Sequence, residues 1–284
     1  MNTGLFRPAS VAEALALLTR LPDARIIAGG ASLVAMINAR LADPAALVSL
    51  ARIEELKDIT EAPGGGFRIG AMVRHRDLAA ETRFGGTLAV VQMAAAQIAN
   101  ATVRNMGTIG GAVAHADPGL DYPPALVAAD ASIEIAAAGG RRQVPAAAFF
   151  VDWYATMLQP GEMVSAVRLP AARSGVGLYH KFARVAGDYA TASVALTMVR
   201  DGAGVATRVA IGACGPTPVL LEEANRLLCG NPGAAELRRA GSLLQAAADP
   251  VDDVRGSAEY RRMLIPRMLE RAFAEARASL GATR

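Results

Sequence analysis

The 284-residue sequence is poor in cysteine and histidine, and these shortages exclude several kinds of metal centre. Its two cysteines, Cys214 and Cys229, are too few for an iron–sulfur cluster held by four thiolates or for a cysteine-based structural zinc site. Its three histidines, His75, His115 and His180, lack metal-ligand spacing, and we interpret them as surface or hydrogen-bonded residues. Any redox chemistry in this chain therefore requires an organic cofactor.

The sequence also lacks a long apolar run and a charge excess. It has no stretch of about 18 consecutive apolar residues, and residues 1–10 lack a basic segment followed by an apolar one. We therefore expect a cytoplasmic protein without a leader or an integral membrane segment. Lys plus Arg total 29 against 26 Asp plus Glu, and the positive residues, nearly all arginines, are scattered among acids, so nucleic-acid binding is not predicted. With 52% hydrophobic residues, the chain is too apolar to be disordered.

Residue periodicity predicts a chain that mixes helices and short strands. Ser10 and Glu13 form a capping box before apolar residues at helical spacing, which predicts a helix over 10–20. Further helices are expected over 31–40, 76–80, 87–100, 220–229, 234–248 and 257–280, with Pro250 and Pro266 as interruptions. Strands are expected over 24–28, 46–50, 67–71, 132–136 and 163–169, and a hairpin is expected from 189–200 and 205–213.

Two segments between these elements have unusual compositions. Residues 170–177 are small, polar and turn-prone, and we interpret them as a domain boundary because the sequence changes in character after them. Residues 104–124 combine four glycines, three prolines, two acids and a histidine with little periodicity. This composition favours an ordered loop system, and loops of this length are often functional.

The first candidate binding motif is AGGASL at residues 28–33. A strand that ends in two glycines, followed by the start of a helix, offers backbone amides that suit a diphosphate. The motif lacks the G-x-G-x-x-G spacing of a dinucleotide fold, and residues 65–72 lack the Lys and Ser or Thr of a P-loop. Taken alone, the two glycines favour a simple tight turn over a binding site.

The second candidate motif is GTIGG at residues 107–111, followed by Asp117 and Asp121. Thr108 can donate a hydroxyl, Gly110 and Gly111 can present amides without side-chain obstruction, and Asp121 can accept hydrogen bonds from sugar hydroxyls. On this hypothesis, Gly110→Val would give a folded protein that binds its cofactor poorly. The alternative is that the glycines allow close packing and the nearby prolines stiffen a buried crossing.

Three segments together resemble one family. They are AGGASL at 28–33, VRNMGTIGGAVAHADPGLDYPPAL at 103–126 and GLYHKFARVAGDYATASVAL at 177–196. They resemble the FAD-binding medium subunits of the molybdenum hydroxylases, which include the medium subunit of carbon monoxide dehydrogenase and the FAD domain of xanthine dehydrogenase. The resemblance covers the whole chain, because the motifs occur in the family's order and spacing.

The resemblance implies an α+β fold of the vanillyl-alcohol-oxidase type. It places an FAD-binding domain at 1–172, with α/β subdomains at about 1–55 and 56–172, before a C-terminal α+β domain at 173–284. It assigns Lys181 and Tyr189 to positions near the flavin, where the ammonium would stabilise the charge of the reduced ring. Without the resemblance, Tyr189 could equally be an ordinary packing residue. The FAD-contacting positions implied are Ala28, Gly29, Gly30, Ala31, Ser32, Leu33, Thr108, Ile109, Gly110, Gly111, Ala112, Asp121, Val164 and Lys181.

One residue departs from the family pattern. The family commonly has a polar residue between the positions of Gly30 and Ser32, and this sequence has Ala31. A side-chain contact to the cofactor is therefore expected to be missing, while the backbone amides remain.

The resemblance further implies electron transfer within a larger complex. A small subunit with two [2Fe–2S] clusters would supply electrons, a large molybdopterin subunit would hydroxylate the substrate, and FAD in this chain would pass electrons to a quinone, NAD or dioxygen. The complex would be a heterotrimer, often doubled. Two alternatives stay open: a stand-alone FAD oxidase or dehydrogenase, for which His115 is the one plausible base, and a scaffold that has lost FAD. The sequence does not distinguish carbon monoxide, purines, N-heterocycles and aldehydes as substrates.

Overall fold

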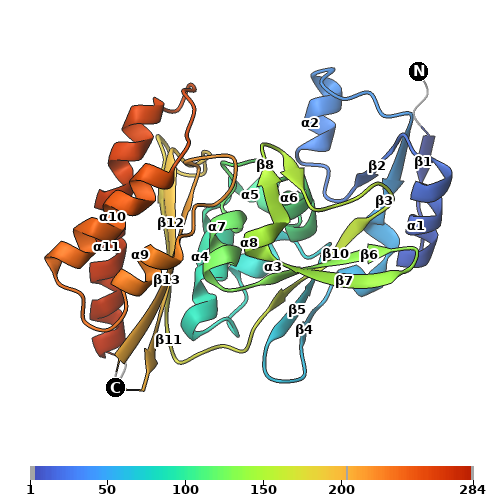
Figure 1. The fold of residues 1–284 in the computed structure, drawn as a ribbon. Helices are drawn as coiled ribbons and strands as arrows, with labels where there is room; N and C mark the ends of the chain where they lie inside the picture. The colour runs from blue at the N-terminus through green and yellow to red at the C-terminus, as the bar shows by residue number, and fades with distance from the viewer. Residues whose placement is uncertain (1–3, 203, 283–284) are drawn as a thin grey trace.

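The small parallel sheet at the N-terminal end carries the first glycine motif at one of its edges. The computed structural model describes residues 4–202 and 204–282, and in that part the sheet has the order β1 (Gly4–Phe6), β3 (Ala46–Ser49), β2 (Ala24–Ile27). Helix α1 (Val11–Arg20) begins where the Ser10 hydroxyl accepts a hydrogen bond from the Glu13 amide, which confirms the predicted N-cap. Helix α2 (Leu33–Asn38) follows β2 after residues 28–32, which contain the two glycines, and stands apart at the top of the molecule (Figure 1).

The central sheet is antiparallel and carries the second glycine motif on one face. Its order is β4 (Ile59–Glu61), β5 (Phe67–Gly70), β10 (Met163–Leu169), β6 (Ser132–Ala137), β7 (Gly140–Pro145). Helix α6 (Ile109–His115) packs against β10. The neighbouring helices are α3 (His75–Ala79), α4 (Ala89–Gln97), α5 (Ala101–Met106), α7 (Tyr122–Ala128) and α8 (Ala146–Phe149), and the hairpin of β8 (Phe150–Asp152) and β9 (Ala155–Thr156) follows.

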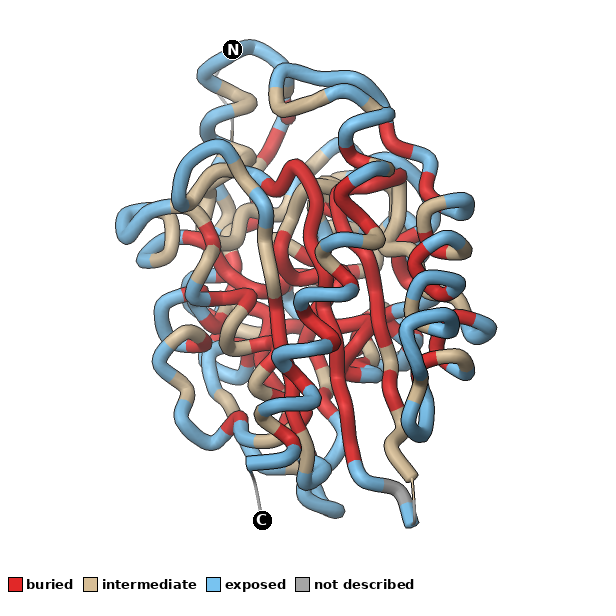
Figure 2. Tube along the Cα trace, turned by 90° about the vertical axis from the view of Figure 1, so that its left-hand side faces the viewer, coloured by how far each residue is buried: buried red, intermediate tan, exposed pale blue. Residues whose placement is uncertain are grey.

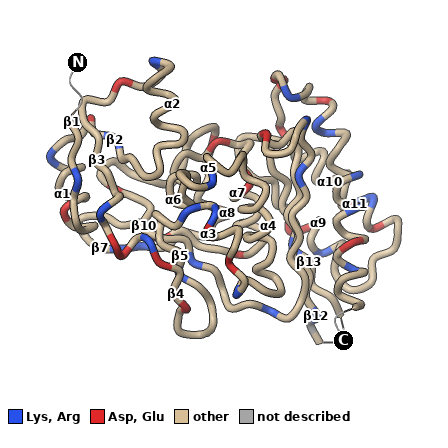
Figure 3. Tube along the Cα trace, turned by 180° about the vertical axis from the view of Figure 1, so that it is seen from behind, with Lys and Arg blue, Asp and Glu red and all other residues tan. Residues whose placement is uncertain are grey.

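A carboxylate surrounded by arginines ties the central sheet together. Glu134 on β6 accepts hydrogen bonds from Arg68, Arg141 and Arg168 at 2.8–3.0 Å, and from the Ser165 hydroxyl at 2.9 Å. Figure 3 shows positive and negative segments intermixed around β5, β7 and β10. The arginines therefore neutralise a carboxylate that is almost completely buried.

The C-terminal part is a three-stranded antiparallel sheet covered on both faces. Strands β11 (Gly175–Phe182), β12 (Ala192–Asp201) and β13 (Gly204–Gly212) pair in that order. Helices α4 and α7 contact this sheet from the central part, and α9 (Glu222–Leu227), α10 (Ala234–Ala247) and α11 (Ala258–Ala282) belong to the C-terminal layer. Figure 2 shows buried strands behind helices whose outer surfaces are exposed. Strands β12 and β13 confirm the predicted hairpin; residue 203 of its turn lies outside the described residues.

Two sequence interpretations were wrong. Residues 104–124 are mainly short helices rather than a loop system, because Asn100 and Thr108 cap α5 and α6 through their side chains. Such short helices contain too few residues to show a period. Pro266 does not interrupt the last helix: it lies inside α11, where Gly241 of α10 allows close approach, since a Cβ there would lie 2.9 Å from the Pro266 Cβ.

Candidate functional site

A cavity of about 1430 Å³ lies between the small parallel sheet, helices α5 to α7 and the loop before β12. Both glycine motifs line it, although about eighty residues separate them along the chain. Drug-sized ligands usually occupy about 300–1,000 Å³, so this cavity suits a longer ligand such as a dinucleotide. The predicted site residues that line it are Ala28, Gly29, Gly30, Ala31, Ser32, Leu33, Thr108, Gly110, Gly111, Ala112, Asp121, Val164 and Tyr189. Ile109 and Lys181 are not among its lining residues, although Lys181 contacts Asp121, which is.

The first glycine motif presents backbone amides that have no acceptor among the described residues. Gly30 has a φ of +78°, and a Cβ on Gly29 would overlap the Met106 carbonyl, so both positions require glycine. In residues 4–202 and 204–282, no hydrogen bond is made by the amides of residues 29–32. Ser32, at the start of α2, does not cap the helix with its side chain. These amides are therefore available to an anion in the cavity.

The second glycine motif uses its amides within the protein instead. The Ile109 amide donates to the Val73 carbonyl at 3.0 Å, and the Gly110 amide donates to the Ala71 carbonyl at 2.9 Å. The Gly111 amide donates to the Thr108 hydroxyl at 3.2 Å. The hypothesis that Gly110 and Gly111 aim free amides at a diphosphate is therefore wrong, because α6 is fastened by these bonds.

Gly110 is required by packing. A Cβ at Gly110 would overlap Ala71, including its backbone. The expectation that Gly110→Val folds normally and only loses cofactor is thus contradicted, since the added side chain has no space in the core. A Cβ at Gly111 would lie 3.5 Å from the Ala28 Cβ. Gly111 is therefore where the second motif comes close to the first.

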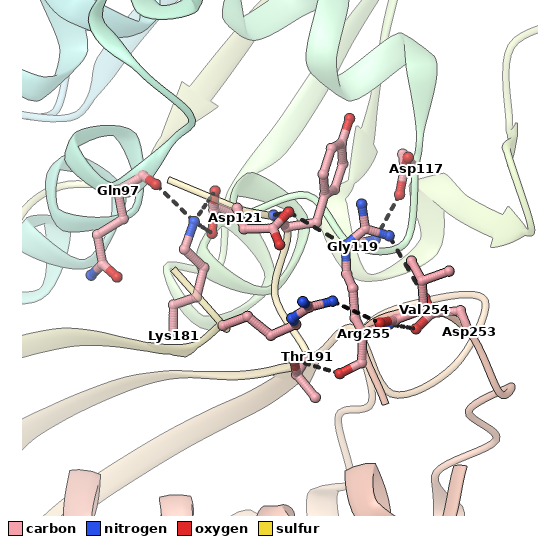
Figure 4. A network of polar contacts seen from close by, with 12 residues as sticks. Gln97, Asp117, Gly119, Asp121, Lys181, Thr191, Asp253, Val254 and Arg255 are labelled. Atoms are coloured by element: carbon pink, nitrogen blue, oxygen red, sulfur yellow. Dashed lines mark hydrogen bonds and ion pairs between the residues drawn. The ribbon is translucent and has the colours of Figure 1, made fainter. Parts of the chain in front are cut away.

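Asp121 and Lys181 form a buried ion pair at the cavity wall. Asp121 precedes α7, and Lys181 lies near the end of β11. The Lys181 ammonium donates to the Asp121 carboxylate at 3.1 Å and to the Gln97 carbonyl at 2.7 Å (Figure 4). The Tyr179 hydroxyl also donates to Asp121, at 2.6 Å. Burial raises the pKa of Asp121, and Lys181 and Tyr179 oppose this shift. Lys181 thus acts on the cavity through Asp121.

Tyr189 lies at the mouth of the cavity and remains partly exposed. Its amide donates to the Asp188 carboxylate at 2.8 Å, which fixes the turn before β12. Burial raises the pKa of Tyr189, and the Asp117 carboxylate raises it further. The phenol therefore stays protonated at neutral pH.

Sequence reasoning missed His75 as a cavity residue. His75 begins α3, and its Nδ1 lies 3.1 Å from the Tyr122 hydroxyl, in contact with the turn between α5 and α6. Burial first, and then the positive charge of Arg104, lowers the pKa of His75 to about 4. A single histidine without a motif carries no sequence signal for this position.

The residues present fit FAD better than a metal. Unpaired amides in the first motif suit the diphosphate, and the cavity is large enough for both halves of the molecule. Within the described part of the chain, no group of three or more His, Cys, Asp or Glu side chains is placed to hold a metal ion. The same residues contain no helix with the length and hydropathy needed to cross a membrane.

Comparison with protein families gives two matches that together span most of the chain. Residues 1–172 match the FAD binding domain in molybdopterin dehydrogenase, and residues 177–276 match the CO dehydrogenase flavoprotein C-terminal domain. The carbon monoxide dehydrogenase medium chain of Hydrogenophaga pseudoflava is 38% identical over 94% of both chains. The nicotine 6-hydroxylase medium subunit of Paenarthrobacter nicotinovorans is 33% identical over 95% of both.

Solved structures give the same answer for the fold. Carbon monoxide dehydrogenase from Hydrogenophaga pseudoflava matches with a TM-score of 0.93 and 37% identity, over 98% of each chain. Quinoline 2-oxidoreductase from Pseudomonas putida 86 matches with a TM-score of 0.91 and 31% identity, over 99% of this chain and 98% of that one. The predicted α+β fold, an FAD-binding domain followed by a flavoprotein C-terminal domain, is confirmed. The chain belongs to the family of FAD-binding medium subunits of the molybdopterin dehydrogenases.

Proposed function

We propose that this chain binds FAD in the cavity and serves as the electron-transferring medium subunit of a molybdenum hydroxylase. The observation that carries the proposal is the set of unpaired amides at residues 29–32, which line the cavity beside the second glycine motif. When bound, FAD would accept electrons singly and release them in pairs to an external acceptor. The chain's own part is to hold the cofactor, to set its electrostatic surroundings and to limit access to it.

The proposal divides the labour at the site among the predicted residues. The residues from Ala28 to Leu33 would bind the diphosphate through their amides, and Thr108 to Ala112 would form the adjoining wall. Asp121 would accept hydrogen bonds from the cofactor, with Lys181 and Tyr179 holding the carboxylate in place. Val164 would make an apolar contact, and Tyr189 would cover the cofactor at the cavity mouth.

The partners follow from the relatives, which are medium chains of multi-subunit enzymes. A small subunit with [2Fe–2S] clusters would deliver electrons, and a large subunit with a molybdopterin cofactor would hold the substrate. We propose a dimer of such heterotrimers in the cytoplasm, with a quinone, NAD or dioxygen as the final acceptor. We also propose domains at 1–172, with subdomains at about 1–55 and 56–172, and at 173–284, an arrangement that the separate sheets support.

A single charge in the first motif tests the proposal. Ala31→Asp places a carboxylate at the start of α2, where it favours the helix but repels a diphosphate and competes for its amides. We expect unchanged thermal stability and an FAD affinity about 10- to 100-fold lower, measured by calorimetric titration of cofactor-depleted full-length protein. Ala31→Asn is the neutral control of the same shape and should retain most of the affinity.

The outcomes separate the proposal from its alternatives. A wild-type chain that shows no flavin absorption after purification and takes up no FAD would be the scaffold that has lost its cofactor. A flavoprotein that oxidises a substrate unaided would be the stand-alone oxidase. Copurification of the complex with iron and molybdenum, together with FAD in this chain, is the result expected for the medium subunit.

A further inference from the structure

The ring of Tyr189 is held between the central part of the chain and the C-terminal part. It packs against Gly119, where a Cβ would lie 3.0 Å from the Tyr189 Cδ1. The Arg255 guanidinium carbon lies over the ring at 4.8 Å from its centroid, a cation–π contact. Figure 4 shows this region, with Gly119 and Arg255 converging from different segments.

Arg255 is itself fixed in place by its own loop. Its amide donates to the Asp253 carboxylate at 2.7 Å, and its carbonyl accepts from the Thr191 hydroxyl at 3.3 Å. Its side-chain Nε lies 3.5 Å from an oxygen of Asp188, the residue that also accepts the Tyr189 amide. The buried Arg261 of α11 forms an ion pair with the Asp253 carboxylate. These contacts fix the backbone of the loop and leave the guanidinium over the Tyr189 ring.

The Tyr189 ring has few other restraints. Among the residues that the structure describes, its hydroxyl has no hydrogen-bond partner, and the side chain is exposed on its remaining side. Gly187, two residues earlier, has a φ of +84° and a Cβ there would lie 2.6 Å from the Ala99 carbonyl oxygen. The backbone of the turn is thus constrained, while the ring depends on Gly119 and Arg255 for its orientation.

We propose that Arg255 is a positioning residue that holds the Tyr189 ring over the cavity mouth and so limits the access of external molecules to the bound cofactor. The inference rests on the proposed binding of FAD in this cavity. Arg255 does not line the cavity and acts through Tyr189. The C-terminal part of the chain would thereby control how readily acceptors in solution reach a cofactor that the N-terminal part binds.

Acrylamide quenching of the fluorescence of bound FAD tests the proposal in the full-length flavoprotein. Acrylamide is neutral, so the loss of an arginine charge does not itself change its approach. The variants are Arg255→Ala, Arg255→Lys, which keeps a cation for the ring, Tyr189→Ala and the double variant. Arg239→Ala is the control, because Arg239 is an exposed residue of α10 paired with Glu223, away from the cavity.

Loss of a cation–π contact at a partly exposed site should change the ratio between covering and displaced positions of the Tyr189 ring about two- to fivefold. We therefore expect the quenching constant to rise by at most this factor in Arg255→Ala and to rise further in Tyr189→Ala. In Arg255→Lys and Arg239→Ala it should stay near the wild-type value. Arg255→Ala should add nothing in the Tyr189→Ala background. FAD affinity and thermal stability, measured on the same proteins, identify any variant whose fold has changed.

The outcomes distinguish two failures. If the wild-type chain binds no FAD, the proposed function fails before this inference is tested. If FAD binds and Tyr189→Ala raises quenching, but Arg255→Ala matches the wild type or acts equally with and without Tyr189, Arg255 does not position the ring. If Tyr189→Ala leaves quenching unchanged, the ring does not cover the cofactor, and the inference is overturned.

Discussion

The ammonium of Lys181 lies 3.1 Å from the carboxylate of Asp121, and the two side chains are only 4% and 7% exposed. A buried ion pair of this kind is costly to break, because the remaining charge loses its partner and has no water to replace it. The pair joins β11 to the start of α7, so it also links the C-terminal sheet to the wall of the cavity. Its integrity should therefore affect both stability and the binding site.

Replacing Lys181 with methionine should destabilise the protein by about 3–5 kcal/mol at neutral pH. Without the ammonium, the pKa of Asp121, already raised by burial from its ordinary 3.8, should rise further. The folded state then holds a proton that the unfolded state releases, so stability falls as pH rises from 3.8 towards the folded pKa. Urea unfolding of the cofactor-free variant should show a larger loss at about pH 8 than at about pH 5.

The double variant Lys181→Met with Asp121→Asn is the matched control. It removes both charges and should recover much of the lost stability, with a flatter pH dependence. A Lys181→Met protein that loses the same free energy at both pH values would contradict the pairing as the source of the effect.

The charge cluster at Glu134 gives a prediction for acid stability. Burial alone would raise the pKa of Glu134, but hydrogen bonds from Arg68, Arg168 and Ser165 outweigh it and lower the pKa to about 2. This depression corresponds to about 3 kcal/mol of stability that is present above the ordinary pKa of 4.5 and lost as pH falls towards 2. Glu134→Gln should therefore be less stable than the wild type near neutral pH by at least that amount.

The difference between Glu134→Gln and the wild type should shrink as the pH falls from 4.5 to 2, because the unfolded wild-type chain takes up a proton at Glu134 over this range while the folded chain keeps the carboxylate charged. Urea unfolding at a series of pH values measures it. A constant difference across this range would show that the arginines do not hold the carboxylate in its charged form.

Sequence alone predicted which segments form the site, and the reason is local. A short segment such as 24–40 contains the whole signal: a strand, a glycine pair and a helix. Both motifs line the cavity. The sequence did not reveal how the second motif works, because the acceptors of its amides, Ala71 and Val73, are more than thirty residues away. The contact between Tyr189 and Arg255 joins residues still further apart, in a loop that has no motif of its own.

His75 provides a third pH-dependent prediction. Its pKa is lowered from 6.5 to about 4, so the folded state keeps the ring neutral while the unfolded state takes up a proton. Stability from this residue is fully present above 6.5 and is lost as the pH falls from 6.5 to 4, by about 3 kcal/mol in total. His75→Gln, which cannot take up the proton, should flatten the unfolding free energy over that interval, and parallel curves for variant and wild type would refute the assignment.

Gly110 and Gly111 differ in what surrounds them, and alanine at each should separate folding from binding. A Cβ at Gly110 would overlap the backbone and the Cβ of Ala71, so Gly110→Ala should cost about 1–3 kcal/mol or more through overpacking. A Cβ at Gly111 would lie 3.1 Å from the Thr108 hydroxyl oxygen and 3.5 Å from the Ala28 Cβ, at the narrow approach between the two motifs. Gly111→Ala should therefore fold with less loss of stability and bind FAD more weakly.

Thermal unfolding without cofactor and calorimetric FAD titration, run on both variants, measure the two effects separately. The expected pattern is a marked drop in stability for Gly110→Ala and, for Gly111→Ala, a drop in affinity that exceeds its drop in stability. The reverse pattern would mean that Gly110, and not Gly111, faces the ligand. It would also mean that the hydrogen bond from the Gly110 amide to the Ala71 carbonyl does not hold α6 in place. Because the two glycines are adjacent on one helix, neither helix propensity nor distance from the cavity can account for a difference between them.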